Sequence, residues 1–191
     1  MLAVVFWSSR RAKDDVGGYE SSLTEFHQAL NANKPEGFRF SATYRVAETP
    51  WFTPKNEIFE DWYVLKNFAA LDSLDYAVMH TGSKDAHRHL MKSTAAASGA
   101  IFALTKGAAR FDGLPEANWM LKPRNMTVDS LIASTRAQLP DGKCSLWTRA
   151  LGLGPTQHCL LSSGPVVFPK NYRAFSAQRE LIWGPSMARL Q

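Results

Sequence analysis

Residues 38–46 read FRFSATYRV, and they show the clearest periodicity in this chain of 191 residues. A polar residue separates each pair of apolar or aromatic residues, which are Phe38, Phe40, Ala42, Tyr44 and Val46. Side chains that alternate with a period of two are typical of a β-strand that buries one of its faces. This stretch therefore predicts a half-buried strand, and the segments around it indicate which sheet it joins.

Three further strands are expected in the same part of the chain. Leu2–Ser9 and Ile58–Lys66 are rich in β-branched and aromatic residues, which favour strands. Thr49–Asn56 contains two prolines and is expected to form the long tip of a hairpin between residues 38–46 and 58–66. Ile101–Thr105 is predicted to be the fourth strand.

Helices are expected between these strands. After a polar turn at Asp14–Gly18, Ser22 and Glu25 have the spacing of a capping box, which predicts a helix that ends near Pro35. A short helix is predicted over residues 68–78, and another over Asp85–Ala97 that ends at Gly99. Residues 1–108 therefore have the element order β-α-β-β-α-β.

The same order is expected again in residues 117–191, after a linker at residues 109–116. One helix is predicted to begin at Thr127 and to end at residues 140–142, and a short one is predicted over Tyr172–Gln178. The predicted strands are Trp119–Lys122, Cys144–Leu151, Gln157–Ser162 and Glu180–Trp183. The recurrence of element order without obvious residue identity indicates a tandem arrangement of two diverged halves.

A β-α-β-β-α-β unit forms a four-stranded antiparallel sheet with both helices on one face, so its other face needs a cover. Two such units in one chain can cover each other by packing sheet against sheet. This α+β architecture resembles the dimeric α/β-barrel superfamily of ferredoxin-like proteins, here as a fused pseudo-dimer. The superfamily includes antibiotic-biosynthesis-type monooxygenases, chlorite dismutases and dye-decolourising peroxidases. The stretch DWYVLKNFAALDSLDYAV (Asp61–Val78) is also similar to a segment of uncharacterised bacterial proteins of this shape.

Composition narrows the class of protein only a little. The net charge of +5 is scattered along the chain, which is typical of a mildly basic solvated surface and not of a basic nucleic-acid-binding tail. The apolar run at Leu2–Trp7 is too short for a signal peptide, and no stretch approaches the length of a membrane span. A soluble, cytoplasmic protein is therefore expected.

The two cysteines, Cys144 and Cys159, lie on the predicted hairpin of the second half. If the hairpin turns between Leu151 and Gly152, the two cysteines face each other across the ladder. A redox pair is one interpretation. Two free, buried thiols are favoured, because cross-strand disulfides are often strained and the cytosol is reducing.

The richest titratable cluster consists of His80, Asp85, His87 and His89. Imidazoles can act as bases or as metal or haem ligands. On one helix His87 and His89 lie about 200° apart and cannot face one ion together, so no metal site is predicted. Haem remains a candidate cofactor, and a solvated helix start is the simpler interpretation. His27 lies on the first predicted helix beside Phe26 and is expected to be a histidine at the boundary between core and surface, not a catalytic one.

Aromatic residues supply the other candidate ligand-binding positions. Trp62 and Tyr63 point to opposite faces of their strand, so one of them could line a pocket between sheet and helix, although plain core packing is favoured. In the second half Trp147, Arg149 and His158 lie on the predicted hairpin. The half that contains Trp62 and His80 is the first place to look for a site, since a diverged tandem pair usually keeps one.

Three classes of function follow from these observations. The first is a pocket for a small apolar or aromatic molecule, of the monooxygenase or a related type, because the resemblance implies a barrel and aromatic residues are abundant. The second is a non-catalytic interaction or assembly domain, which an exposed aromatic patch at Trp51 and Phe52 would favour. The third is an RNA-binding module, which Glu57–Asn67 disfavours because it lacks the glycine pattern of RNA-recognition strands. The chain is expected to be a monomeric pseudo-dimer or a homodimer.

Overall fold

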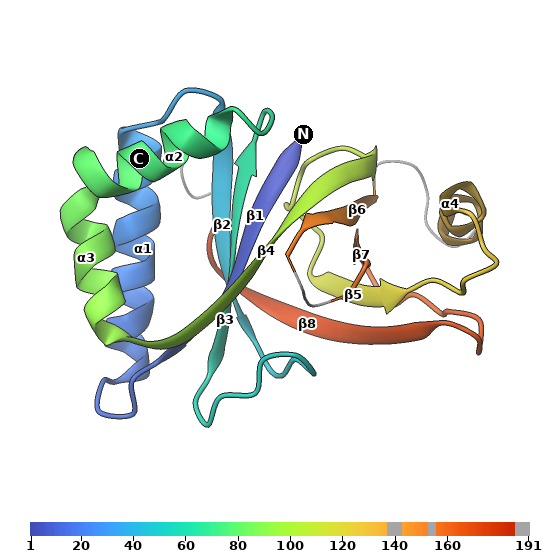
Figure 1. The fold of residues 1–191 in the computed structure, drawn as a ribbon. Coiled ribbons are helices and arrows are strands. Elements are labelled where there is room, and N and C mark those ends of the chain that lie inside the picture. The colour runs from blue at the N-terminus through green and yellow to red at the C-terminus, as the bar shows by residue number, and fades with distance from the viewer. Residues whose placement is uncertain (137–142, 153–155, 186–191) are drawn as a thin grey trace.

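The computed structural model describes residues 1–136, 143–152 and 156–185. Within these residues eight strands form a closed barrel in the order β1-β3-β2-β8-β5-β7-β6-β4. Every pair of neighbouring strands is antiparallel. Three helices pack on one side of the barrel and one helix on the opposite side (Figure 1). None of the helices in the described ranges is long and apolar enough to cross a bilayer.

The N-terminal half contains β1 (Leu2–Arg10), α1 (Val16–Ala32), β2 (Phe38–Val46), β3 (Ile58–Leu65), α2 (Ala70–His80), α3 (Lys84–Ser93) and β4 (Thr94–Gly107). The C-terminal half contains β5 (Glu116–Leu121), α4 (Val128–Arg136), β6 (Cys144–Leu151), β7 (His158–Ser162) and β8 (Arg173–Trp183). The strand predicted at residues 38–46 therefore has the observed bounds, and so does the strand at Cys144–Leu151.

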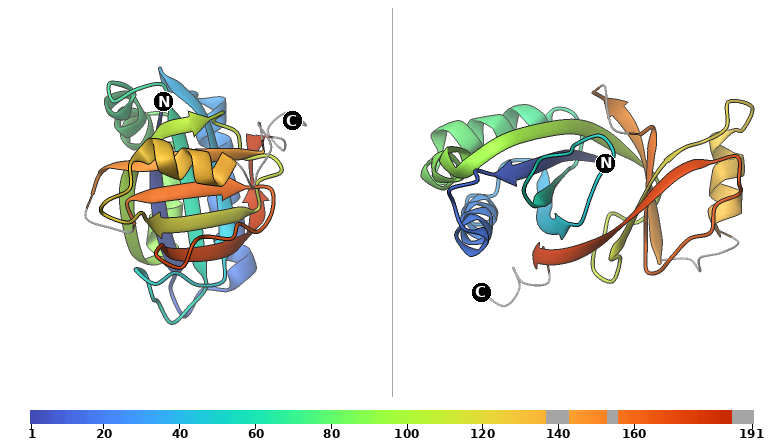
Figure 2. Two further views of the ribbon diagram at one scale, coloured as in Figure 1. Left: turned by 90° about the vertical axis from the view of Figure 1, so that its right-hand side faces the viewer. Right: turned by 90° about the horizontal axis from the view of Figure 1, so that it is seen from below.

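The two halves have the same strand order. The first half runs β4-β1-β3-β2 around the barrel, and the second runs β8-β5-β7-β6. Two equivalent junctions join them, since β4 pairs with β6 and β8 pairs with β2. Figure 2 shows the two sheets crossing with their helices on the outer faces. This arrangement confirms the prediction of two ferredoxin-like sheets packed as a pseudo-dimer.

The first half differs from prediction at two helix ends. Helix α1 begins at Val16, because Asp15 caps it by accepting a bond from the backbone N–H of Gly18 at 2.8 Å. The predicted turn and capping box were therefore wrong, and Ser22 instead donates to the carbonyl of Gly18 inside the helix. Helix α3 ends at Ser93, since residues 94–100 pair with β1 as a strand.

The second half differs from prediction in its last element. The helix predicted over Tyr172–Gln178 is absent, because residues 173–178 pair with β5 and residues 179–183 pair with β2. One continuous strand, β8, therefore links the two halves. The predicted helix end at residues 140–142 lies outside the described residues.

The hairpin of β6 and β7 has a different register from the one expected. Cys159 faces Trp147, and Cys144 faces Ser162, so the two cysteines are not paired across the ladder. No disulfide joins the two cysteines; Cys159 is fully buried and Cys144 is half-buried.

The barrel interior is an aromatic core with one ion pair at its centre. The Nε1 groups of Trp7 and Trp62 donate to the two carboxylate oxygens of Glu60. Arg179, from the other half, lies 3.3 Å from Glu60 Oε1, and both side chains are fully buried. The guanidinium also stacks on the ring of Tyr44 at 4.1 Å. Separate apolar clusters lie between the sheets and the outer helices.

Candidate functional site

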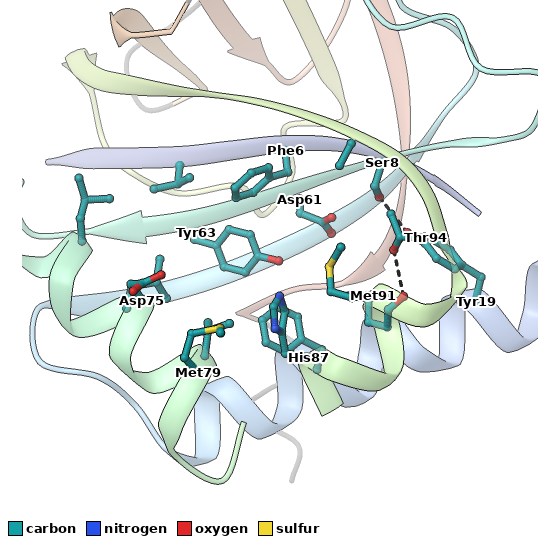
Figure 3. A pocket seen from close by; sticks show the side chains of 17 residues that line it. Phe6, Ser8, Tyr19, Asp61, Tyr63, Asp75, Met79, His87, Met91 and Thr94 are labelled. Carbon is teal, nitrogen blue, oxygen red and sulfur yellow. Dashed lines mark hydrogen bonds between the residues drawn. The ribbon is translucent and has the colours of Figure 1, made fainter. Parts of the chain in front are cut away.

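A pocket of about 450 Å³ lies between the first sheet and the three helices that cover it. We call it the sheet–helix pocket (Figure 3). Its apolar lining residues are Val4, Phe6, Phe26, Leu71, Leu74, Val78, Met79, Leu90, Met91 and Ala97. Its polar lining residues are Ser8, Tyr19, Asp61, Tyr63, Asp75, His87 and Thr94. A volume of this size with a mainly apolar wall suits a small organic ligand.

Strand alternation explains which residues face this pocket. Val4, Phe6 and Ser8 lie on the outer face of β1, and Asp61 and Tyr63 lie on the outer face of β3. All residues of β3 are buried, because one face meets the barrel interior and the other meets the helices. An ionisable residue such as Asp61 therefore stands in an otherwise apolar layer.

Asp61 is held by a buried hydrogen-bonded chain. Its Oδ1 lies 3.2 Å from Nε2 of His27, and Nδ1 of His27 lies 2.7 Å from the hydroxyl of Ser41. All three residues are buried, with His27 fully inaccessible to solvent. Both ring nitrogens of His27 therefore have a hydrogen-bond partner. His27 thus lies deep under α1, not at the boundary position that was expected.

Tyr63 forms the wall next to Asp61. Its ring stacks on the ring of His27, and its edge meets the ring of Phe6. Burial raises the pKa of the Tyr63 hydroxyl well above its ordinary value, and the nearby charge of Asp61 raises it further. The hydroxyl therefore keeps its proton and can donate or accept a hydrogen bond. Figure 3 shows Tyr63, Asp61 and His87 around the same space.

His87 closes the helix side of the pocket from α3. Its ring lies 5.3 Å from the ring of Phe26. Burial lowers the pKa of His87, and this effect exceeds the opposite influence of Asp75. The imidazole is therefore uncharged at neutral pH.

The mouth of the pocket is apolar and partly exposed. Phe6, Met79 and Met91 line it and expose 41%, 47% and 44% of their surfaces. Phe6 lies across Gly99 of β4, where an added Cβ would stand only 2.7 Å from the ring. The glycine therefore lets the aromatic ring lie flat along the edge of the pocket. Methionine side chains adapt to ligands of different shape.

The residues that the sequence singled out fall in several places. Tyr63 and His87 line the sheet–helix pocket. Trp62 and Trp147 instead point into the barrel, where their rings lie 5.6 Å apart. Trp147 Nε1 donates to Ser145. The opposite orientation of Trp62 and Tyr63 follows from strand alternation, as expected.

The other three candidates do not line this pocket. His80 is exposed at the end of α2, where its ring lies 4.9 Å from that of Tyr76. Arg149 is half-buried on β6. His158 is buried on β7, with Nδ1 3.0 Å from the hydroxyl of Thr148 and Nε2 without a partner among the described residues. Burial and the charge of Lys122 lower the pKa of His158 to about 4.

Asp61 and its partner His27 were not predicted as site residues. The available signal was the presence of two carboxylates, Glu60 and Asp61, among the apolar and aromatic residues of IFEDWYVL. The partner could not be inferred, because residues 27 and 61 are brought together only by the packing of α1 on the sheet.

The second half does not repeat this polar arrangement. In the first sheet Asp61 pairs with Phe6 on one neighbouring strand and with Thr43 on the other. In the second sheet Leu160 pairs in the same way with Asn118 and Leu146. The twofold relation that exchanges the two junctions superposes these two positions. It also places Ser162 at the position of Tyr63, so the pair of polar groups is specific to the first half.

The pocket does not fit an anionic cofactor. The described residues that line it include Asp61 and Asp75 and no lysine or arginine. Haem propionates and flavin phosphates are anionic and would meet these carboxylates without a cation to bind them. Within the described ranges no group of three or more histidine, cysteine, aspartate or glutamate side chains is arranged to hold a metal ion.

Comparison with known proteins places the fold. No family model and no curated protein matches the sequence. A proposed monooxygenase from Lactobacillus acidophilus NCFM is 11% identical and has a TM-score of 0.52, with 96% of this chain and 98% of that one covered. An anthrone oxidase-like protein is 10% identical and has a TM-score of 0.50, with 96% and 92% covered. SnoaB, a cofactor-independent oxygenase from Streptomyces nogalater, is 13% identical and has a TM-score of 0.41, with 57% and 97% covered.

Full-length similarity at such low identity shows the fold alone, and the strand order given above agrees with it. The chain therefore has the dimeric α/β-barrel fold of ferredoxin-like proteins, with both sheets supplied by one polypeptide as a pseudo-dimer.

Proposed function

We propose that this protein binds a small apolar or aromatic molecule in the sheet–helix pocket of its first half. The observation that carries the proposal is the pocket itself, about 450 Å³ in volume, with ten apolar lining residues and a few polar groups. Pockets with an apolar wall and few convergent polar groups are typical of sites for small organic ligands.

A monooxygenase-type reaction is the first chemistry to test in this pocket. The similar folds of a proposed monooxygenase and an anthrone oxidase-like protein motivate anthrone as the first substrate probe. In the reaction one oxygen atom of O₂ becomes the new carbonyl oxygen of anthraquinone. The other oxygen leaves as water with the two hydrogens of the anthrone methylene group. No separate reductant is needed for this balance.

The test of binding uses two tryptophan substitutions on β4. Ala97 lines the pocket, whereas its exposed neighbour Ala96 points to the other side of the strand. We expect Ala97→Trp to fill the pocket and to weaken the binding of anthrone at least tenfold in a calorimetric or fluorescence titration. The matched variant Ala96→Trp keeps wild-type affinity. Equal affinities of the two variants would place the ligand elsewhere.

The test of chemistry measures anthraquinone formation and oxygen consumption in air. Anthrone turnover above the rate without protein, lost in Ala97→Trp and kept in Ala96→Trp, supports an enzyme. Binding without turnover supports a binding protein. Titration with haem and with flavin completes the assay, and unchanged visible spectra are expected from the acidic lining of the pocket.

The alternative functions have no specific structural support. Trp51 and Phe52 do not form an exposed patch, because they pack against the barrel core; Trp51 lies 5.4 Å from Trp7 and 5.2 Å from Trp119. An RNA-binding sheet needs an exposed aromatic face, and all residues of β3 are buried. A cytoplasmic location and the division at residues 109–116 remain predictions.

A further inference from the structure

The polar end of the sheet–helix pocket contains the buried carboxyl group of Asp61. The side chain of Asp61 is 5% exposed, and its only side-chain hydrogen bond among the described residues joins Oδ1 to His27. Figure 3 shows the Asp61 carboxylate directed into the pocket beside Tyr63. One carboxylate oxygen is therefore left to accept a bond from a ligand.

The other groups of the pocket do not supply a compensating cation. His87 is uncharged at neutral pH, because burial lowers its pKa. Asp75 adds a second carboxylate near the mouth. A buried carboxylate is costly unless it meets a cation or several hydrogen-bond donors.

The walls around Asp61 also suit a cation. The rings of Phe6 and Phe26 lie 6.2 Å and 6.1 Å from the ring of Tyr63, and all three aromatic side chains line the same pocket as the carboxyl group of Asp61. Aromatic faces attract ammonium groups, and methionine side chains such as Met79 and Met91 adapt to the apolar body that carries the charge.

We propose that the ligand of the sheet–helix pocket is an apolar molecule with one protonated amine, and that the amine pairs with the carboxylate of Asp61. This inference rests on the proposed binding function and specifies its ligand class. The hydroxyl of Tyr63 accepts a second bond from the ammonium group, and the apolar part of the ligand lies against α2 and α3. His27 is a positioning residue that fixes the direction of the carboxylate.

The test compares four probes that share one ring system, each titrated into the full chain at neutral pH. Naphthylmethylamine is a cation, naphthylmethanol is neutral, methylnaphthalene has no polar group and naphthoate is an anion. We expect the amine to bind roughly ten- to a hundredfold more tightly than the alcohol, as for a hydrogen bond to a charged group, and naphthoate to bind most weakly.

Two isosteric substitutions assign the selectivity to one carboxylate. Asp61→Asn should remove the preference for the amine over the alcohol. Asp72→Asn, at an exposed position of α2 outside the lining of the pocket, should change it less than about threefold, because its charge is screened by solvent. The wild-type ratio alone tests the inference if Asp61→Asn does not fold.

The outcomes separate this inference from the proposed function. If amine and alcohol bind equally tightly to the wild-type chain, or if Asp61→Asn keeps the ratio, the ligand class is wrong while the binding function stands. If none of the four probes binds, the proposed function fails and the ligand class fails with it.

Discussion

The ring of His27 lies flat against the ring of Tyr63, with centroids 5.2 Å apart and planes that differ by 7°. His27 comes from α1 and Tyr63 from β3, and the same imidazole contacts Asp61, two residues earlier on that strand. One side chain from the helix therefore fixes both polar groups that the strand presents to the pocket. This relationship connects the packing of α1 to the chemistry of the site.

Loss of His27 should destabilise the fold. His27→Leu leaves Asp61 as a buried carboxylate without its partner, and we expect the free energy of unfolding to fall by about 3–5 kcal/mol. Urea unfolding followed by circular dichroism measures the effect. His80→Leu, at an exposed position, should change stability by less than about 0.5 kcal/mol. A small effect of His27→Leu would mean that Asp61 does not depend on the imidazole.

The ion pair between Glu60 and Arg179 should couple the two halves. Glu60→Gln leaves a fully buried guanidinium without its counter-charge, at an expected cost of about 3–5 kcal/mol. The double variant Glu60→Gln with Arg179→Met should lose less stability than the sum of the two single variants. A double-mutant cycle by urea unfolding gives the coupling energy, and strictly additive effects would contradict the pairing.

Acidification should destabilise the second half through His158. The pKa of His158 is about 4 in the folded protein, whereas an unperturbed histidine, as in the unfolded chain, has a pKa of 6.5. Between these two pH values the unfolded chain therefore binds more protons than the folded protein. Stability is therefore lost as the pH falls from about 6.5 towards about 4. His158→Gln should flatten this part of the curve of unfolding free energy against pH, whereas His80→Gln should leave it unchanged. Identical curves for the wild type and His158→Gln would show that this histidine titrates normally.

The two thiols should differ in reactivity. Burial raises the pKa of Cys159 well above its ordinary value, so little thiolate forms and reagents cannot reach it. We expect Ellman's reagent to modify one thiol of the native protein, Cys144, and both thiols in urea. Cys144→Ser should remove the native reaction. Rapid modification of Cys159 in the folded variant would show that the barrel opens.

Several elements could be predicted from sequence because the signal for each is local. The alternation of FRFSATYRV predicted the bounds of β2, and the bounds predicted for β6 were also confirmed. The order of elements then predicted the barrel, because each four-stranded sheet has one face without helices, and the two sheets can cover these faces by packing against each other. Tyr63 and His87 were identified as candidates from residue type alone. Tyr63 and His87 line the same pocket only because α3 packs on the side of the sheet to which Tyr63 points.

Sequence alone indicated the alternation of β2, because the period of a strand is independent of distant partners, and the order of elements indicated the pseudo-dimeric architecture. Tertiary structure decided the rest. Residues 173–183 became one strand because β5 and β2 both offered backbone partners, and neither partner is visible in the local sequence. The register of the β6–β7 hairpin separated Cys144 from Cys159. The contact between His27 and Asp61, 34 residues apart, arose only when α1 packed on the sheet, because burial requires each polar group to find a partner in space.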